Sequence, residues 1–422
     1  MINIKKVDRY VDRRVLTLRL ICSILMLAFL SLIFLSYENA GRVILLVESL
    51  LLFVILAINY QVLSTRSRLA VLLLNLLSLA LTAIFYSGLG SILTYFNLLS
   101  AFYVFNNISL TQKELRKIRA FTACLLLAYF LTSNIGSPYS FSELYDVLGG
   151  RVNSNIVGML MLALTFNAAN CLELLSVNKK YRVFLVVLTL LAGGYFIYLS
   201  KCRSAMISLA VLTVLLLFWK KPMGYKVYKI LSVAVLIFSL AITVIYVAMY
   251  NSYSELEILG KKLFTGREIV WRSAFERIRE SAIIGNGNSV ALDTVGGKTT
   301  VSAHNMLLSI WYTIGIIPMM TTVLFFVNRL DKKNDRPTNT FSRCAFIASL
   351  FVGFFESFYT DSTLQMFFLV LLLSNLNTED ERNDTKEDPL LLVRGKAAER
   401  AGKKMRRVVE KTFPRLRDNR VE

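Results

Sequence analysis

Long apolar runs separated by short polar segments recur along most of this chain. A helix needs roughly 20 apolar residues to cross a hydrocarbon layer about 30 Å thick, and most of the runs approach this length. They predict twelve membrane-spanning helices, near residues 16–36, 43–59, 69–86, 90–106, 118–133, 155–174, 183–199, 203–219, 228–249, 304–327, 341–358 and 362–377. The pattern therefore indicates an all-α, polytopic membrane protein with a transmembrane domain over residues 16–378.

Composition agrees with this class. Hydrophobic residues make up 55% of the chain, and the mean hydropathy is +0.56, well above that of a soluble globular protein. The first run is too long for a signal peptide and lacks a small-residue cleavage site, so we interpret it as the first span. The five cysteines are scattered, without CxxC spacing, which favours apolar filling over a metal site or a disulfide framework.

Lysine and arginine indicate the orientation of the spans. They gather at the amino terminus (1–15), in the tail (379–422) and in every second short loop, which places these segments in the cytosol. The basic loops carry Arg66, Arg68, Lys113, Arg116, Lys117, Lys179, Lys180, Arg182, Lys220, Lys221, Lys226, Arg329, Lys332, Lys333 and Arg336. Orientation of spans explains the net charge of +20 better than nucleic-acid binding does.

One short outer loop departs from this rule. Lys201 and Arg203 lie on the outer side between the seventh and eighth spans. The long outer loop, 250–303, adds Lys261, Lys262, Arg267, Arg272, Arg277 and Arg279. Together these residues predict a positively charged chamber outside the membrane.

The long outer loop contains an amphipathic helix, predicted over residues 265–282 from its apolar spacing. Thr265 and Glu268 match a T-x-x-E capping box at its start. Arg267 is unusual there, because a cation in the first turn opposes the helix dipole. A guanidinium beside free backbone amides forms a good anion pocket, particularly for phosphate. The alternative is a surface arginine paired with a nearby carboxylate.

The only histidine of the chain, His304, opens the tenth span, with Ser302 as its expected helix cap. An imidazole titrates near neutral pH, so it can take a proton from a sugar hydroxyl. It can also hydrogen-bond a phosphate oxygen, or serve the structure alone. These roles stay open at this point.

Other chemistries find little support. A single histidine excludes a multi-histidine metal centre, and the first outer loop offers only Glu38, not the acidic pair of metal-dependent membrane glycosyltransferases. There is no Walker loop and no GxSxG elbow. The segment "GGYF" at 193–196 is expected to pack helices together.

The order of the outer motifs resembles the superfamily of O-antigen ligases and O-antigen polymerases. These motifs are Ser200 and Arg203, then Gly266, Arg267 and Trp271, then "GNG" at 285–287, and then "AHN" at 303–305. The segment "RVNSN" at 151–155 is similar to the Asn-rich start of a span in those proteins. The resemblance covers roughly residues 90–377.

This resemblance implies a C-type glycosyltransferase fold that needs neither a metal nor a cofactor. It also implies donors and acceptors carried on undecaprenyl diphosphate at the outer leaflet of a bacterial cell membrane. The family's essential arginines correspond to Arg203 and Arg267, and its histidine to His304, which we expect to be catalytic. Substrate-binding candidates are Trp271, Arg272, Asn305 and Glu356.

Polymerase and ligase share such a site, and we favour the polymerase, which suits capsule, exopolysaccharide and O-antigen systems alike. A chain-length regulator protein is then a further candidate partner. A different class, a twelve-span secondary transporter, expects a long cytosolic connection after the sixth span. The sequence has only the short "LSVNKKYR" segment there.

Overall fold

A computed structural model gives the fold. It describes residues 4–33, 38–59, scattered positions between 73 and 105, 109–136, 143–145, 150–173, 175, 177–218, 223–248, 257–258, 261–262, 266–287, 290–294, 297, 299–300, 302–328, 340–357, 365–374 and 377–379.

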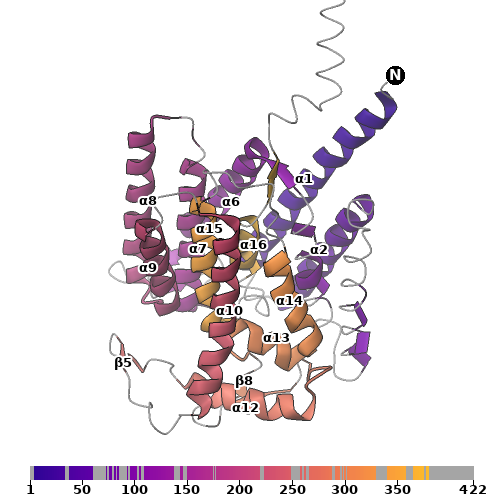
Figure 1. Ribbon diagram of the computed structural model, residues 1–422, viewed down its shortest axis with the longest axis vertical. Coiled ribbons are helices and arrows are strands. Elements are labelled where there is room, and N and C mark those ends of the chain that lie inside the picture. The colour runs from indigo at the N-terminus through magenta and orange to yellow at the C-terminus, as the bar shows by residue number, and fades with distance from the viewer. Residues whose placement is uncertain are drawn as a thin grey trace, which may run out of the picture.

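Helices dominate the described chain (Figure 1). They are α1 (Ile4–Ile33), α2 (Glu38–Ile58), α6 (Gln112–Thr132), α7 (Ser154–Glu173), α8 (Lys179–Leu199), α9 (Arg203–Phe218), α10 (Tyr225–Ala248), α12 (Arg267–Glu280), α13 (Met306–Ile314), α14 (Ile316–Asn328), α15 (Thr340–Leu350) with the 3-10 turn η4 (Phe351–Phe354), and α16 (Gln365–Ser374).

The strands are short and join neighbouring loops. They are β1 (Ser109–Thr111), β2 (Asn134–Ile135), β3 (Leu144–Tyr145), β4 (Arg151–Val152), β5 (Glu257–Ile258), β6 (Lys261–Lys262), β7 (Leu292–Asp293), β8 (Thr299–Thr300) and β9 (Asn377–Glu379). Parallel pairing of β1 with β9 joins the segment before α6 to the segment after α16, and the remaining pairs are antiparallel.

Within the described residues, four helices are long and apolar enough to cross a membrane: Val15–Ile33, Ser154–Glu173, Lys179–Leu199 and Lys226–Ala248. Three shorter apolar helices, Val43–Ile58, Arg203–Phe218 and Thr340–Phe354, coincide with further predicted spans. The all-α membrane class is therefore confirmed, and the number of twelve spans stays a prediction. Most of the predicted span 69–86, about half of the predicted span 90–106 and the basic tail beyond residue 379 lie outside the described residues.

The predicted tenth span, 304–327, is divided into two helices. Helix α13 ends at Gly315, whose φ of 95° lies outside the range that other residues adopt readily. A side chain there would also collide with the chain, because an added Cβ would lie 1.9 Å from the carbonyl oxygen of Ile283. The break lets α13 lie against α12 at one end of the molecule while α14 turns back along the helical body (Figure 1).

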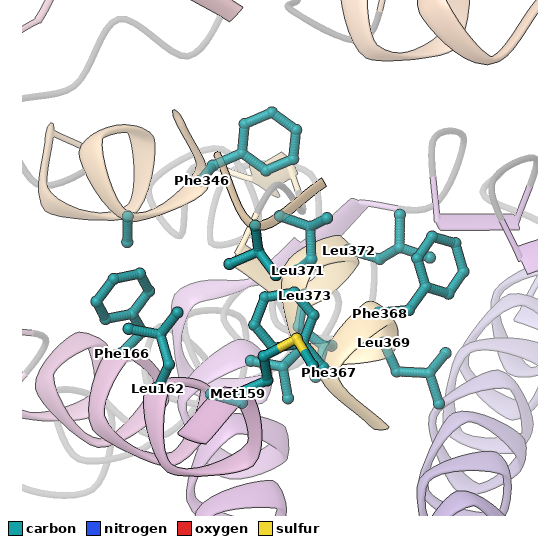
Figure 2. Packing of buried hydrophobic residues seen from close by; sticks show 14 of the residues in the cluster. Met159, Leu162, Phe166, Phe346, Phe367, Phe368, Leu369, Leu371, Leu372 and Leu373 are labelled. Carbon is teal, nitrogen blue, oxygen red and sulfur yellow. The ribbon is translucent and has the colours of Figure 1, made fainter. Parts of the chain in front are cut away.

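Helix α16 is the centre of the packing. Every residue from Phe367 to Leu373 is at most 3% exposed, whereas a helix at the lipid boundary would leave one face open. Its neighbours are α1, α6, α7 and α15. Figure 2 shows its side chains surrounded by Met159, Leu162 and Phe166 of α7 and by Phe346 of α15.

Helix α8 lies at the edge of the molecule, against α7 and α9 (Figure 1). Large apolar side chains along it are exposed, including Leu191 (68%) and Tyr195 (62%), as expected for a helix that faces lipid. Gly193 faces α7, where an added Cβ would lie 2.0 Å from the Thr165 hydroxyl. The prediction that "GGYF" packs helices together is therefore confirmed.

Candidate functional site

Four helices, α7, α9, α12 and α13, begin around one buried carboxylate, that of Glu356. This residue follows η4 in the chain, and its backbone amide donates to the carbonyl of Val352. The amino terminus of a helix carries free N–H groups and a partial positive charge, so this end of the molecule favours anions before any side chain is counted. Helix α12 and the start of α13 close this end of the helical body (Figure 1).

Glu356 binds three of the surrounding segments. The Arg267 Nη2 group donates to Glu356 Oε1 at 2.6 Å, and Asn155 Nδ2 donates to the same oxygen at 3.1 Å. The imidazole Nδ1 of His304 lies 3.4 Å from Glu356 Oε2. The Arg267 and Glu356 side chains are only 12% and 9% exposed, and the ring of Phe355 lies 5.9 Å from the guanidinium. Arg267 is thus paired with a carboxylate, but in a buried site and not on the surface.

Arg203 is the first residue of α9. It lies next to the cluster formed by Glu356, Arg267, Asn155 and His304. The thiol of Cys202 donates to the carbonyl of Asn155 at 3.4 Å, which fixes the start of α9 against the start of α7. The Arg203 and Arg267 guanidinium groups are close enough for their charges to repel each other. The three residues predicted to be catalytic, Arg203, Arg267 and His304, therefore gather at one site.

A glycine of α7 permits this close approach. An added Cβ at Gly158 would lie 2.1 Å from Cys202 Cβ and 2.6 Å from Ser200 Oγ. Burial raises the pKa of the Cys202 thiol, so at neutral pH the group is a packed neutral thiol and not a nucleophile.

The backbone is unusual at three helix starts of the site. Lys201 (φ 55°) and His304 (φ 47°) adopt left-handed conformations that non-glycine residues seldom do, and Gly266 (φ 84°) precedes Arg267 directly. Such conformations are retained where surrounding contacts hold them, often at functional sites. Helix α12 begins after Gly266, which offers no side-chain cap, and Thr265 of the predicted Thr265–Glu268 capping box lies outside the described residues.

Hydrogen bonds fix the loop that carries His304. The cap of α13 is Asn305, not Ser302 as predicted: its Oδ1 accepts from the amide of Leu308 at 3.0 Å, and its Nδ2 donates to Ser239 of α10. Ser302 instead accepts from the His304 amide. The buried Asn305 side chain thus positions the histidine, and its role in substrate binding stays a prediction.

Trp271 also acts on the His304 loop. Its fully buried indole donates from Nε1 to the carbonyl of Ala303 at 2.9 Å, while the amide of Ala303 donates to Ser309. Helix α12 is thereby joined to the residue directly before the imidazole. We interpret Trp271 as a positioning residue for His304, whereas direct contact with substrate stays a prediction.

Trp271→Phe is expected to lower transfer activity about tenfold or more. The substitution keeps an aromatic side chain but leaves the buried Ala303 carbonyl without its donor, at a cost of about 1–3 kcal/mol. Trp311→Phe is the matched control, because Trp311 donates an indole bond of similar length to the carbonyl of Ala282, which follows the carboxyl end of α12 and does not adjoin His304. Both variants should lose similar stability in thermal unfolding, but only Trp271→Phe should lose activity in a membrane glycan-transfer assay. Equal losses of activity would contradict the positioning role.

The "GNG" motif joins the ends of α12 and α13. The amides of Asn286 and Gly287 donate to the carbonyls of Tyr312 and Thr313 at 2.8 and 2.9 Å. The Asn286 side chain bridges the carbonyls of Arg277 and Tyr312. Gly285 has φ of 81°, and an added Cβ there would lie 2.5 Å from the Thr313 backbone. The motif therefore holds α12 and α13 together and supplies no reactive group.

Arg272 forms its ion pair away from the residues around Glu356. It pairs with Glu276 on the exposed side of α12, where its side chain is 67% exposed. It lies five positions after Arg267, so the two side chains project about 140° apart around the helix. Its role in substrate binding stays a prediction.

Sequence reasoning missed Asn155 as an individual residue, although it singled out the segment "RVNSN". Asn155 donates to Glu356 across 201 positions of the chain, a pairing that no local pattern shows. Among the residues that the structure describes, no group of three or more His, Cys, Asp or Glu side chains could hold a metal ion.

Chemically, the cluster is suited to an anionic ligand with a nearby hydroxyl. Two guanidinium groups and one carboxylate leave net positive charge at the helix starts. The His304 side chain is 36% exposed, so part of its ring is open to a ligand.

Comparison with known families gives a match that includes most of this site. Residues 185–323 match the family model of O-antigen ligase, a segment that contains Arg203, Arg267 and His304. The resemblance to the O-antigen ligase and polymerase superfamily is thereby confirmed. No curated protein and no solved structure matches the chain.

Proposed function

We propose that this protein, which the match over residues 185–323 connects to the O-antigen ligases and polymerases, polymerises lipid-linked glycans. Oligosaccharide repeat units on undecaprenyl diphosphate would be joined into surface polysaccharide at the outer leaflet of the bacterial cell membrane. The protein would cross that membrane many times with both termini in the cytosol. The observation that carries the proposal is the convergence of Arg267, His304 and Asn155 on Glu356, beside Arg203.

In the proposed reaction the acceptor hydroxyl attacks the anomeric carbon of the donor. The bond between that carbon and the diphosphate oxygen breaks, and its electron pair leaves with the diphosphate. Arg203 and Arg267 would bind the diphosphate and stabilise the negative charge that develops on it. This electrostatic role is one that a metal ion fills in other glycosyltransferases, so the proposal needs no metal.

His304 would take the proton of the acceptor hydroxyl as the new bond forms. Attack from the face opposite the diphosphate inverts the configuration at the anomeric carbon. Because the hydroxyl and the leaving group lie on opposite sides of that carbon, the imidazole and the guanidinium groups must flank it. The joining of helix starts from separate parts of the chain around Glu356 supports such an arrangement.

Ligation is the second candidate, because the matching family model is described as O-antigen ligase. A ligase would move finished glycan from the lipid carrier to a final acceptor, through the same diphosphate-binding groups. The two activities differ in what the acceptor hydroxyl belongs to, a lipid-linked repeat in one case and a final acceptor in the other.

The glycans that accumulate in a deletion strain separate the two. Loss of a polymerase is expected to leave single repeat units on the lipid carrier, whereas loss of a ligase should leave long polymer without its final attachment. Lipid-linked glycans extracted from the strain and sized by mass spectrometry check this, and the wild-type gene in trans is the control. Unchanged long surface glycan in the deletion strain would contradict both assignments.

A further inference from the structure

Glu356 is shared between the groups proposed to bind the donor and the group proposed to accept the proton. Oε1 accepts from Arg267 and Asn155, and Oε2 faces His304. A carboxylate that forms an ion pair with a guanidinium at 2.6 Å can only accept hydrogen bonds. The Nδ1 atom of His304 must therefore carry the proton toward Glu356, which leaves the lone pair of the neutral ring on Nε2.

The two contacts of the carboxylate are unequal. Its distance to the guanidinium, 2.6 Å, is that of a strong charge-assisted bond, whereas 3.4 Å to the imidazole is longer than an ordinary hydrogen bond. Glu356 thus interacts mainly with Arg267. The orienting contact to the imidazole is present but incomplete.

A diphosphate at the site changes this balance. Its oxygens bind guanidinium groups as a carboxylate does, and with more negative charge. They therefore compete with Glu356 for the N–H groups of Arg267. The Asn155 amide carries no charge that a diphosphate would attract strongly, so it keeps hold of Oε1 while the Arg267 contact loosens.

Building on the proposed function, we propose that Glu356 couples binding of the donor diphosphate to the ability of His304 to accept a proton. When the diphosphate engages Arg267, the carboxylate shifts toward Nδ1 of His304, with Asn155 as its fixed anchor. A full hydrogen bond at Nδ1 orients the ring and stabilises the imidazolium that forms when Nε2 accepts a proton. His304 thus gains its full hydrogen bond to Glu356 only when the donor diphosphate is bound. Proton transfer to the imidazole is therefore disfavoured before the donor binds.

The single histidine makes this measurable in the whole protein. Protein labelled with ¹⁵N-histidine, purified with a tag that lacks histidine, gives imidazole signals from His304 alone. In the wild type, neutral His304 is expected to carry its proton on Nδ1, and inorganic pyrophosphate should shift the Nδ1 proton signal downfield as the bond to Glu356 shortens. A neutral ring with its proton on Nε2, or no shift when pyrophosphate binds, would overturn the coupling.

Glu356→Gln separates coupling from a merely structural role. Because Arg267 then lacks its carboxylate partner, pyrophosphate should bind the variant about tenfold more tightly, a difference of about 1.4 kcal/mol, and the Nδ1 response should be absent. Weaker binding than in the wild type would show that Glu356 only maintains the site.

Asn155→Ala is the second variant, which keeps every charge of the site and tests the coupling if Glu356→Gln does not fold. It should bind pyrophosphate but show a smaller Nδ1 response, and an unchanged response would overturn the anchoring role.

Failure of the coupling and failure of the proposed function remain distinct. Wild-type protein that binds pyrophosphate with an unaltered imidazole signal overturns the coupling and leaves diphosphate-dependent transfer intact. Wild-type protein that shows no binding at millimolar pyrophosphate overturns the diphosphate site itself, and the coupling with it.

Discussion

Arg267→Lys is expected to lower the rate of glycan transfer by about two to three orders of magnitude, the usual cost of removing a group that stabilises transition-state charge. Lysine keeps the positive charge and can still pair with the buried Glu356, so the fold should survive. What it lacks is the planar fork of several N–H groups that binds two oxygens of a phosphate side by side. The rate of extension of lipid-linked repeats in isolated membranes measures the effect.

Arg279→Lys is the matched control for this substitution. Arg279 lies on the same helix, α12, but its side chain is exposed. The control should keep wild-type activity, with both variants present in membranes at equal amounts. Similar rates for the two variants would show that charge alone suffices at position 267, and would contradict the need for a guanidinium there.

The helical class was predictable because membrane helices are encoded locally. A run such as that of α8 or α10 needs no distant residue to be recognised, since lipid imposes its apolar composition directly. The hydropathy pattern did not predict the break at Gly315. Apolar residues continue on both sides of this glycine, and a single glycine hardly alters the pattern. The interior place of α16 was equally hidden, because lipid-facing and protein-facing apolar residues look alike in sequence.

The site was predictable in part, where a residue conflicts with its local surroundings. The sequence indicated Arg267 because the helix dipole disfavours a cation in the first turn unless an anion lies nearby. The anion that the structure supplies, Glu356, comes from 89 positions later in the chain. No periodicity connects these residues, and the same holds for Asn155. The left-handed conformation of His304 was not predictable either, because it results from the bonds of Ala303 and Asn305 on each side.

That conformation determines how the histidine should be tested. With φ of 47°, position 304 suits asparagine, which adopts the left-handed region more readily than alanine does. His304→Asn therefore removes the imidazole while it preserves the turn between Ala303 and Asn305. An alanine variant would combine loss of the base with backbone strain, and its result could not be assigned to either.

We expect His304→Asn to lower the transfer rate by about two to four orders of magnitude, the usual contribution of a general base. Its affinity for inorganic pyrophosphate should change little, because the guanidinium groups remain. A single-turnover assay with purified protein, together with calorimetric titration of pyrophosphate, separates the two effects. If the variant instead keeps its rate and loses affinity, the imidazole is a phosphate ligand. The proton would then have to leave the acceptor by another route.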